Sequence, residues 1–65
     1  MEVELNGVRV NTAARTLAAL LDEQRFEAKT VATAINGDFV PLSLREASRL
    51  TEGDKIEVLA PMQGG

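Results

Sequence analysis

The amino-acid sequence predicts one α+β domain in which a single main helix packs on one face of a mixed β-sheet. Three observations lead to this prediction. The chain opens with two alternating segments around an Asn-Gly pair, a leucine stripe at helical spacing follows them, and another alternating segment lies near its end. Strands grouped with one helix are typical of α+β domains. A chain of 65 residues has room for one such domain with a small core.

Residues 1–11 predict a β-hairpin. Residues 1–5 alternate apolar and acidic side chains, so the apolar ones share one face of a half-buried strand. Asn6-Gly7 follows, and both residues tolerate the positive φ angles that a two-residue hairpin turn requires. Val8–Asn11 alternates again and is expected to form the return strand.

The next expected element is a helix over residues 17–24. Thr16 is a suitable N-cap, because its hydroxyl can accept a hydrogen bond from a free backbone N–H. Leu17, Leu20 and Leu21 then fall on one face at helical spacing, and the acidic side chains point away from it. The leucine stripe is therefore expected to pack on the sheet.

Two further strands are expected in the middle of the chain. Residues 31–35 are rich in β-branched side chains and lead into a second Asn-Gly pair, Asn36-Gly37. Phe39 and Val40 continue as a short strand, and Pro41 limits further pairing because proline has no N–H to donate. Residues 44–47 could form one helical turn.

The last strand is predicted over residues 55–60, after a turn at residues 51–54. Because side chains alternate along a strand, Leu59 falls on the face that should be wet. The residues on that face are Lys55, Glu57 and Leu59, and those on the opposite face are Ile56, Val58 and Ala60.

Pairing of the first and last strands at the centre of the sheet would make the sheet mixed and send the chain out from its middle. This arrangement is the β-grasp. It implies one domain over residues 1–60, followed by a flexible Gly-Gly tail over residues 61–65. The residues expected in the core are Val3, Leu5, Leu17, Leu20, Leu21, Ile56 and Val58.

The composition argues against several classes of function. Cys and His are absent, which removes disulfides, thiol catalysis, imidazole acid–base chemistry and Cys/His metal sites. The formal net charge is -3 and no basic cluster occurs, so nucleic acid is not an expected partner. No apolar run is long enough to span a membrane, and we expect a cytoplasmic protein without a bound cofactor or metal.

The sequence ends in Gly64-Gly65, which we interpret as a reactive end. Glycine has no Cβ, so such a pair can enter a narrow channel and present its carboxylate to the active site of another protein. Met62 and Gln63 are candidates for recognition in an extended conformation, or they are simply a linker. The alternative for the two glycines is a frayed tail.

Several short motifs occur in an order and spacing that are typical of one family. They are Asn6-Gly7, Thr16-Leu17 with Leu20-Leu21, Ala34-Ile35-Asn36-Gly37, Val40-Pro41, Gly53-Asp54 with Ile56 and Val58, and Pro61-Met62-Gln63-Gly64-Gly65. In these motifs, and over its whole length, the chain resembles the ThiS family of sulfur-carrier proteins of thiamine biosynthesis, within the ubiquitin-like β-grasp superfamily. One departure is Leu42, because the family often carries Arg directly after Val-Pro. Arg45 lies nearby in the sequence.

The resemblance implies a protein co-substrate, a sulfur carrier rather than an enzyme. The implied partners are an ATP-dependent adenylating enzyme of the ubiquitin-activating type, a cysteine desulfurase system as sulfur donor, and a thiazole synthase. The first enzyme would use ATP to adenylate the carboxylate of Gly65, and sulfur would then displace AMP to leave a thiocarboxylate. The thiazole synthase would take up that sulfur for thiazole formation, so the hard chemistry would belong to the partners.

Leu59, together with Phe39 or Leu42, is a candidate face for docking these partners. Single exposed apolar residues are also common on ordinary protein surfaces. Three other functions stay open at this point. They are a small subunit of molybdopterin synthase or another thiocarboxylate carrier, a ubiquitin-like modifier, and a β-grasp protein-binding module whose tail is never activated.

Overall fold

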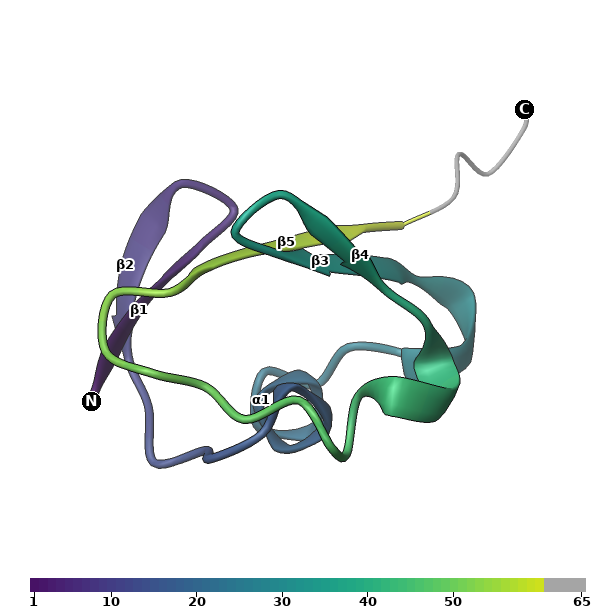
Figure 1. Ribbon diagram of the computed structural model, residues 1–65, viewed down its shortest axis with the longest axis horizontal. Coiled ribbons are helices and arrows are strands. Elements are labelled where there is room, and N and C mark those ends of the chain that lie inside the picture. Colours follow the sequence, from purple (N-terminus) through teal and green to yellow (C-terminus); the bar gives the residue numbers. More distant parts are fainter. Residues whose placement is uncertain (61–65) are drawn as a thin grey trace.

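A mixed sheet forms one layer of the protein and a helix forms the other (Figure 1). The computed structural model describes residues 1–60. The strands are β1 (Glu2–Leu5), β2 (Val8–Asn11), β3 (Ala32–Ile35), β4 (Asp38–Val40) and β5 (Lys55–Leu59). The helical elements are α1 (Leu17–Glu23) and two 3-10 turns, η1 (Ala28–Thr30) and η2 (Leu42–Leu44).

The strands lie in the order β2-β1-β5-β3-β4 across the sheet. β5 pairs parallel with β1 and antiparallel with β3, so the last strand of the chain is the central one. The two outer pairs, β1 with β2 and β3 with β4, are antiparallel hairpins. This is the β-grasp topology, and it confirms the fold class that the sequence predicts.

Both hairpins turn at an Asn-Gly pair, as expected. The φ angles are 50° and 83° at Asn6 and Gly7, and 52° and 88° at Asn36 and Gly37. These left-handed conformations are costly for most residues, whereas asparagine and glycine adopt them readily. The two turns lie side by side at the same end of the sheet (Figure 1).

Helix α1 begins where its cap predicts. The Oγ1 atom of Thr16 accepts a hydrogen bond from the Ala19 N–H at 3.1 Å, which satisfies one of the free donors of the first turn. The helix ends at Glu23, one residue earlier than expected, and Gln24 is its C-cap. Leu17, Leu20 and Leu21 form its buried face, which is the predicted leucine stripe.

The core lies between α1 and the inner face of the sheet. Every residue expected in the core is buried, and Leu17 and Leu20 are entirely inaccessible to solvent. The buried apolar residues are Val3, Leu5, Ala14, Leu17, Leu20, Leu21, Val40, Leu50, Ile56 and Val58. The alternation of side chains along β1 and β5 therefore correctly predicts which residues of both strands face the core.

Three local predictions need correction. The 3-10 turn spans Leu42–Leu44 rather than residues 44–47, because it starts directly after Pro41, whose fixed φ of -68° leads into it. Residues 45–47 continue as turns, in which the N–H groups of Arg45 and Ala47 donate to the carbonyls three residues earlier. Ala60 lies outside β5 and is exposed, and Val31 precedes β3, because the β3–β5 ladder ends at the pair Ala32 and Leu59.

Candidate functional site

The central strand β5 leads directly to the C-terminal segment. Ile56 and Val58 point into the core and are buried, so this strand is fixed by its side chains as well as by its two neighbours. Leu59 is the last residue of the strand and is 66% exposed. The end of the chain therefore starts from a firmly held position in the middle of the sheet.

The two Asn-Gly turns also hold β5 through their side chains. The Nδ2 atom of Asn6 donates to the Val58 carbonyl at 3.1 Å, and the Val58 N–H donates to Oδ1 of Asn6 at 2.8 Å. On the other side, the Lys55 N–H donates to Oδ1 of Asn36 at 2.9 Å. These amides extend the backbone ladder where β1 and β3 turn away, so both asparagines act on the strand that carries the chain end.

Asp54 closes the turn that starts β5. Its carboxylate accepts hydrogen bonds from the N–H and hydroxyl of Thr51, at 2.8 and 2.9 Å, and from Nδ2 of Asn36 at 3.0 Å. Burial raises the pKa of this carboxyl, but the three hydrogen bonds favour the charged form more strongly and hold the pKa below its ordinary value. The predicted turn at residues 51–54 is thus confirmed, and its carboxylate links β5 to the β3–β4 hairpin.

A second carboxylate with a perturbed pKa lies away from this strand. The hydroxyl of Thr12 donates to both carboxylate oxygens of Glu23, at 2.9 and 2.7 Å, and this bonding lowers the pKa of Glu23. Thr12 is buried, and its hydroxyl also accepts from the Ala14 N–H at 2.9 Å. The arrangement joins the end of α1 to the segment that follows β2, which gives it a structural role.

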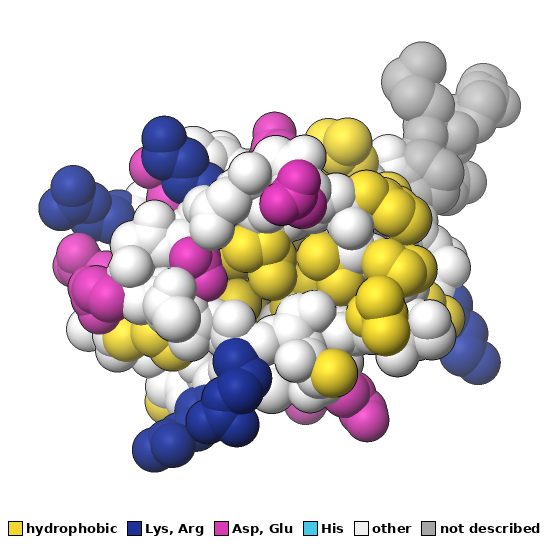
Figure 2. Space-filling model, viewed as in Figure 1, with side chains coloured by type: hydrophobic (Ala, Val, Ile, Leu, Met, Phe, Trp, Pro, Cys, Tyr) yellow, Lys and Arg dark blue, Asp and Glu magenta, His cyan; other side chains and the backbone are white. Residues whose placement is uncertain are grey.

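The outer face of the sheet is apolar near the end of β5. In the strand register Leu59 pairs with Ala32, and Phe39 pairs with Ala34, so these four side chains share the face that points away from α1. Phe39 is 70% exposed, and the two alanines between the larger side chains leave a shallow surface. Hydrophobic side chains gather on the side of the molecule where β5 ends (Figure 2). We call Ala32, Ala34, Phe39 and Leu59 the outer-face patch.

Comparison with known proteins agrees with this geometry. The family model described as the ThiS family matches residues 2–65. This chain belongs to the ThiS family. The crystal structure of a thiamine biosynthesis protein (ThiS) from Geobacter metallireducens matches with a TM-score of 0.84 and 26% identity, covering 100% of both chains. The NMR structure of a thiamine biosynthesis protein from the same organism gives a TM-score of 0.80 at 26% identity, covering 100% of this chain and 88% of that one. No curated protein matches the sequence.

The candidate residues of this ThiS-family chain do not all meet at one place. Leu59 and Phe39 lie together on the outer face, as their strand register requires. Leu42, although 53% exposed, belongs to η2 and borders a different hollow beside α1. Met62, Gln63, Gly64 and Gly65 lie outside the described residues.

The sequence does not reveal the environment of Arg45, the arginine that lies near Leu42. Only 3% of this residue is exposed, and the guanidinium makes three hydrogen bonds to neutral oxygens. Nε donates to Oγ1 of Thr33 at 3.0 Å, Nη1 to the Ala28 carbonyl at 2.7 Å, and Nη2 to the Val31 carbonyl at 2.6 Å. No carboxylate within residues 1–60 forms an ion pair with it. Arg45 therefore ties η2 to η1 and β3, and it does not project as a partner contact.

The described part of the chain also contains no metal-binding cluster. No group of three or more acidic side chains within residues 1–60 is placed to hold a metal ion. Across the same residues, no helix has the length and apolar character needed to cross a membrane.

Proposed function

We propose that this protein is the sulfur carrier of a thiazole-forming pathway in thiamine biosynthesis. The observation that carries the proposal is the ThiS-family match, which extends to residue 65 and so includes the Gly-Gly end. The similarity to two thiamine biosynthesis proteins over the whole chain supports the same role.

The chemistry proposed for the tail needs an external activating enzyme. A carboxylate is a poor electrophile at neutral pH, so the carboxylate of Gly65 first attacks the α-phosphorus of ATP and releases pyrophosphate. The resulting acyl adenylate has AMP as a good leaving group. The terminal sulfur of a persulfide on the cysteine desulfurase system then displaces AMP to form an acyl disulfide. A thiol reduces this disulfide and leaves a thiocarboxylate, from which a thiazole synthase takes the sulfur. The carrier supplies the carboxylate and its presentation, and the partners supply the catalytic groups.

The outer-face patch is the docking surface that we assign to the activating enzyme. Contiguous exposed apolar patches often mark protein interaction sites. Leu59 and Phe39 form the two larger parts of this patch, at the end of the strand from which the tail departs. Docking there would leave Gly64 and Gly65 as the part of the chain that enters the enzyme's active site.

Intact mass spectrometry gives a direct test of sulfur transfer. The chain is incubated with ATP, the activating enzyme, cysteine and the desulfurase. Replacement of one terminal oxygen atom by sulfur should increase the mass of the chain by the difference between the atomic masses of sulfur and oxygen. A control without ATP should show no change. A mass that stays constant in the complete reaction would refute the carrier function and favour a binding module.

Two variants of the tail test the role assigned to Gly65. Deletion of Gly65 withdraws the carboxylate by roughly 3.5 Å in an extended chain, whereas reaction geometry is sensitive to displacements of about 1 Å. ATP–pyrophosphate exchange should therefore be almost abolished. Gly64→Val should act similarly, because a β-branched side chain restricts the backbone and widens the segment. Normal exchange by both variants, with unchanged melting, would show that Gly65 is not the activated residue.

A further inference from the structure

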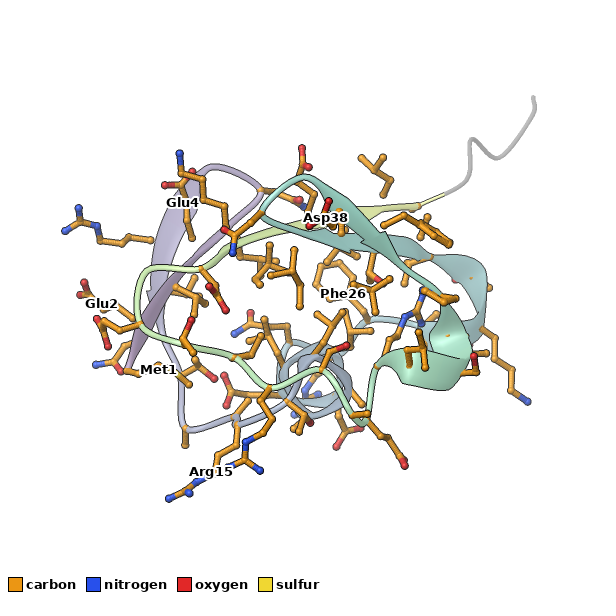
Figure 3. The ribbon with its side chains drawn as sticks, in the orientation of Figure 1. Met1, Glu2, Glu4, Arg15, Phe26 and Asp38 are labelled. Carbon is orange, nitrogen blue, oxygen red and sulfur yellow. The ribbon has the colours of Figure 1, made fainter. Side chains whose placement is uncertain are left out.

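A hollow of about 430 Å³ opens beside α1, on the helical side of the molecule. Leu21 is buried at its base, and Phe26 and Leu42 contribute partly exposed apolar surface. Phe26 lies between the sheet and α1 (Figure 3), and η2 approaches α1 from the end of β4 (Figure 1). The hollow therefore belongs to a different layer from the outer-face patch.

Two acidic side chains, Asp22 and Glu46, also line this hollow, and both are exposed. Neither carboxylate has a hydrogen bond or an ion pair with any residue between 1 and 60. Arg45 is the basic residue in the described lining, but its three guanidinium nitrogens donate to Thr33, Ala28 and Val31. The hollow thus combines an apolar base with two acidic groups that the chain itself does not pair.

We propose that this hollow docks a segment of a partner protein that inserts an apolar side chain and carries Lys or Arg beside it. The apolar side chain would contact Leu21, Phe26 and Leu42, and the basic group would face Asp22 and Glu46. This pattern matches the general build of protein interfaces, in which an apolar centre is surrounded by a polar and charged rim. Charge selects the partner, because an acidic segment or a nucleic acid would be repelled by the two carboxylates.

Leu42 is the residue on which this inference depends most. Leu42 is 53% exposed, so its apolar surface is removed from water only when another molecule covers it. Replacement by Arg would remove apolar surface and place a cation beside Asp22 and Glu46 within the same chain. The guanidinium introduced by Leu42→Arg should therefore pair with these two carboxylates, in place of the basic group of the partner. The inference does not rest on the proposed sulfur-carrier function, because the hollow and the outer-face patch are separate.

The test uses the full chain, labelled with ¹⁵N, and two synthetic peptides. The first is an amphipathic helix built only from Leu and Lys, and the second has Glu in place of every Lys. The Leu/Lys peptide should shift the backbone amide signals of Ala18, Asp22, Phe26, Ser43 and Glu46. Leu42→Arg should weaken this binding by about tenfold, since it removes both an apolar contact and the charge attraction. The Leu/Glu peptide should not bind.

A pair of charge-matched variants separates a specific site from general attraction to an acidic protein. Asp22→Asn/Glu46→Gln removes the two carboxylates of the hollow and should weaken binding about fourfold, since each exposed ion pair contributes roughly twofold. Glu4→Gln/Glu57→Gln changes the net charge equally on the outer face of the sheet and should leave affinity nearly unchanged. Equal weakening by both pairs, or amide shifts confined to the outer face, would overturn the proposal, as would equal binding of the Leu/Glu peptide.

Discussion

Replacement of Asn6 tests whether a side chain helps to hold the central strand. Its amide makes two hydrogen bonds with the backbone of Val58, at 3.1 and 2.8 Å, and its φ angle is 50°. Each bond contributes about 1 kcal/mol, and a left-handed conformation costs alanine about 1 kcal/mol more. Asn6→Ala should therefore lower the free energy of unfolding by about 3 kcal/mol. Asn6→Gly should lower it by about 2 kcal/mol, because glycine adopts this φ without strain.

Urea denaturation followed by circular dichroism measures both variants. A domain of this size has a total stability of roughly 3–10 kcal/mol, so both losses should move the midpoint clearly. Val8→Ala is the control in the same hairpin, since Val8 is 63% exposed and should change stability by less than about 0.5 kcal/mol. If Asn6→Gly matches wild type and only Asn6→Ala is destabilised, the backbone conformation alone matters and the side-chain bonds to β5 contribute nothing.

Three further predictions address the core, the outer face and acid stability. Leu20→Ala should cost about 2–5 kcal/mol, because Leu20 is fully buried and the truncation leaves a cavity; thermal melting would show this, and an unchanged midpoint would contradict the core assignment. Leu59→Glu should melt normally but bind the activating enzyme at least about tenfold more weakly; unchanged affinity would remove Leu59 from the docking surface. The pKa of Asp54 is lowered in the folded state, so its stabilisation is present above its ordinary pKa and is lost as pH falls through the folded pKa. Asp54→Asn should thus be less stable than wild type near neutrality, and the gap should close in acid; a gap independent of pH would refute the role of the charge.

The elements that the sequence predicts best are those with complete local signals. The hairpin turns require only that Asn and Gly tolerate positive φ, and the cap of α1 requires only the hydroxyl of Thr16 three residues before its donor. Alternation in β5 similarly fixes which face holds Leu59. In each case, residues within one turn or strand determine the outcome, so no knowledge of distant contacts is needed.

The features that the sequence leaves undetermined depend on contacts between distant segments. Arg45 finds its three acceptors 12 to 17 residues away, and an arginine between Leu44 and Glu46 gives no sign of such burial. Leu42 and Phe39 are separated by only two positions, yet the turn after Pro41 sends Leu42 to the helical side. The sequence alone offers Phe39 and Leu42 as alternative neighbours of Leu59 on one face. In the structure Phe39 shares the face of Leu59, and Leu42 does not. Only the fold separates them.

The central position of β5 sets a limit on how any partner can use the chain end. Gly65 lies six positions after Leu59, and an extended chain of that length reaches at most about 20 Å. Val58, directly before Leu59, is fixed by burial and by both groups of the Asn6 amide. Under the proposed function, an enzyme that docks on the outer-face patch and adenylates Gly65 must therefore have its adenylation site within that distance of Leu59. A complex with a longer separation would require β5 to leave the sheet, at the cost of exposing Ile56 and Val58 to water.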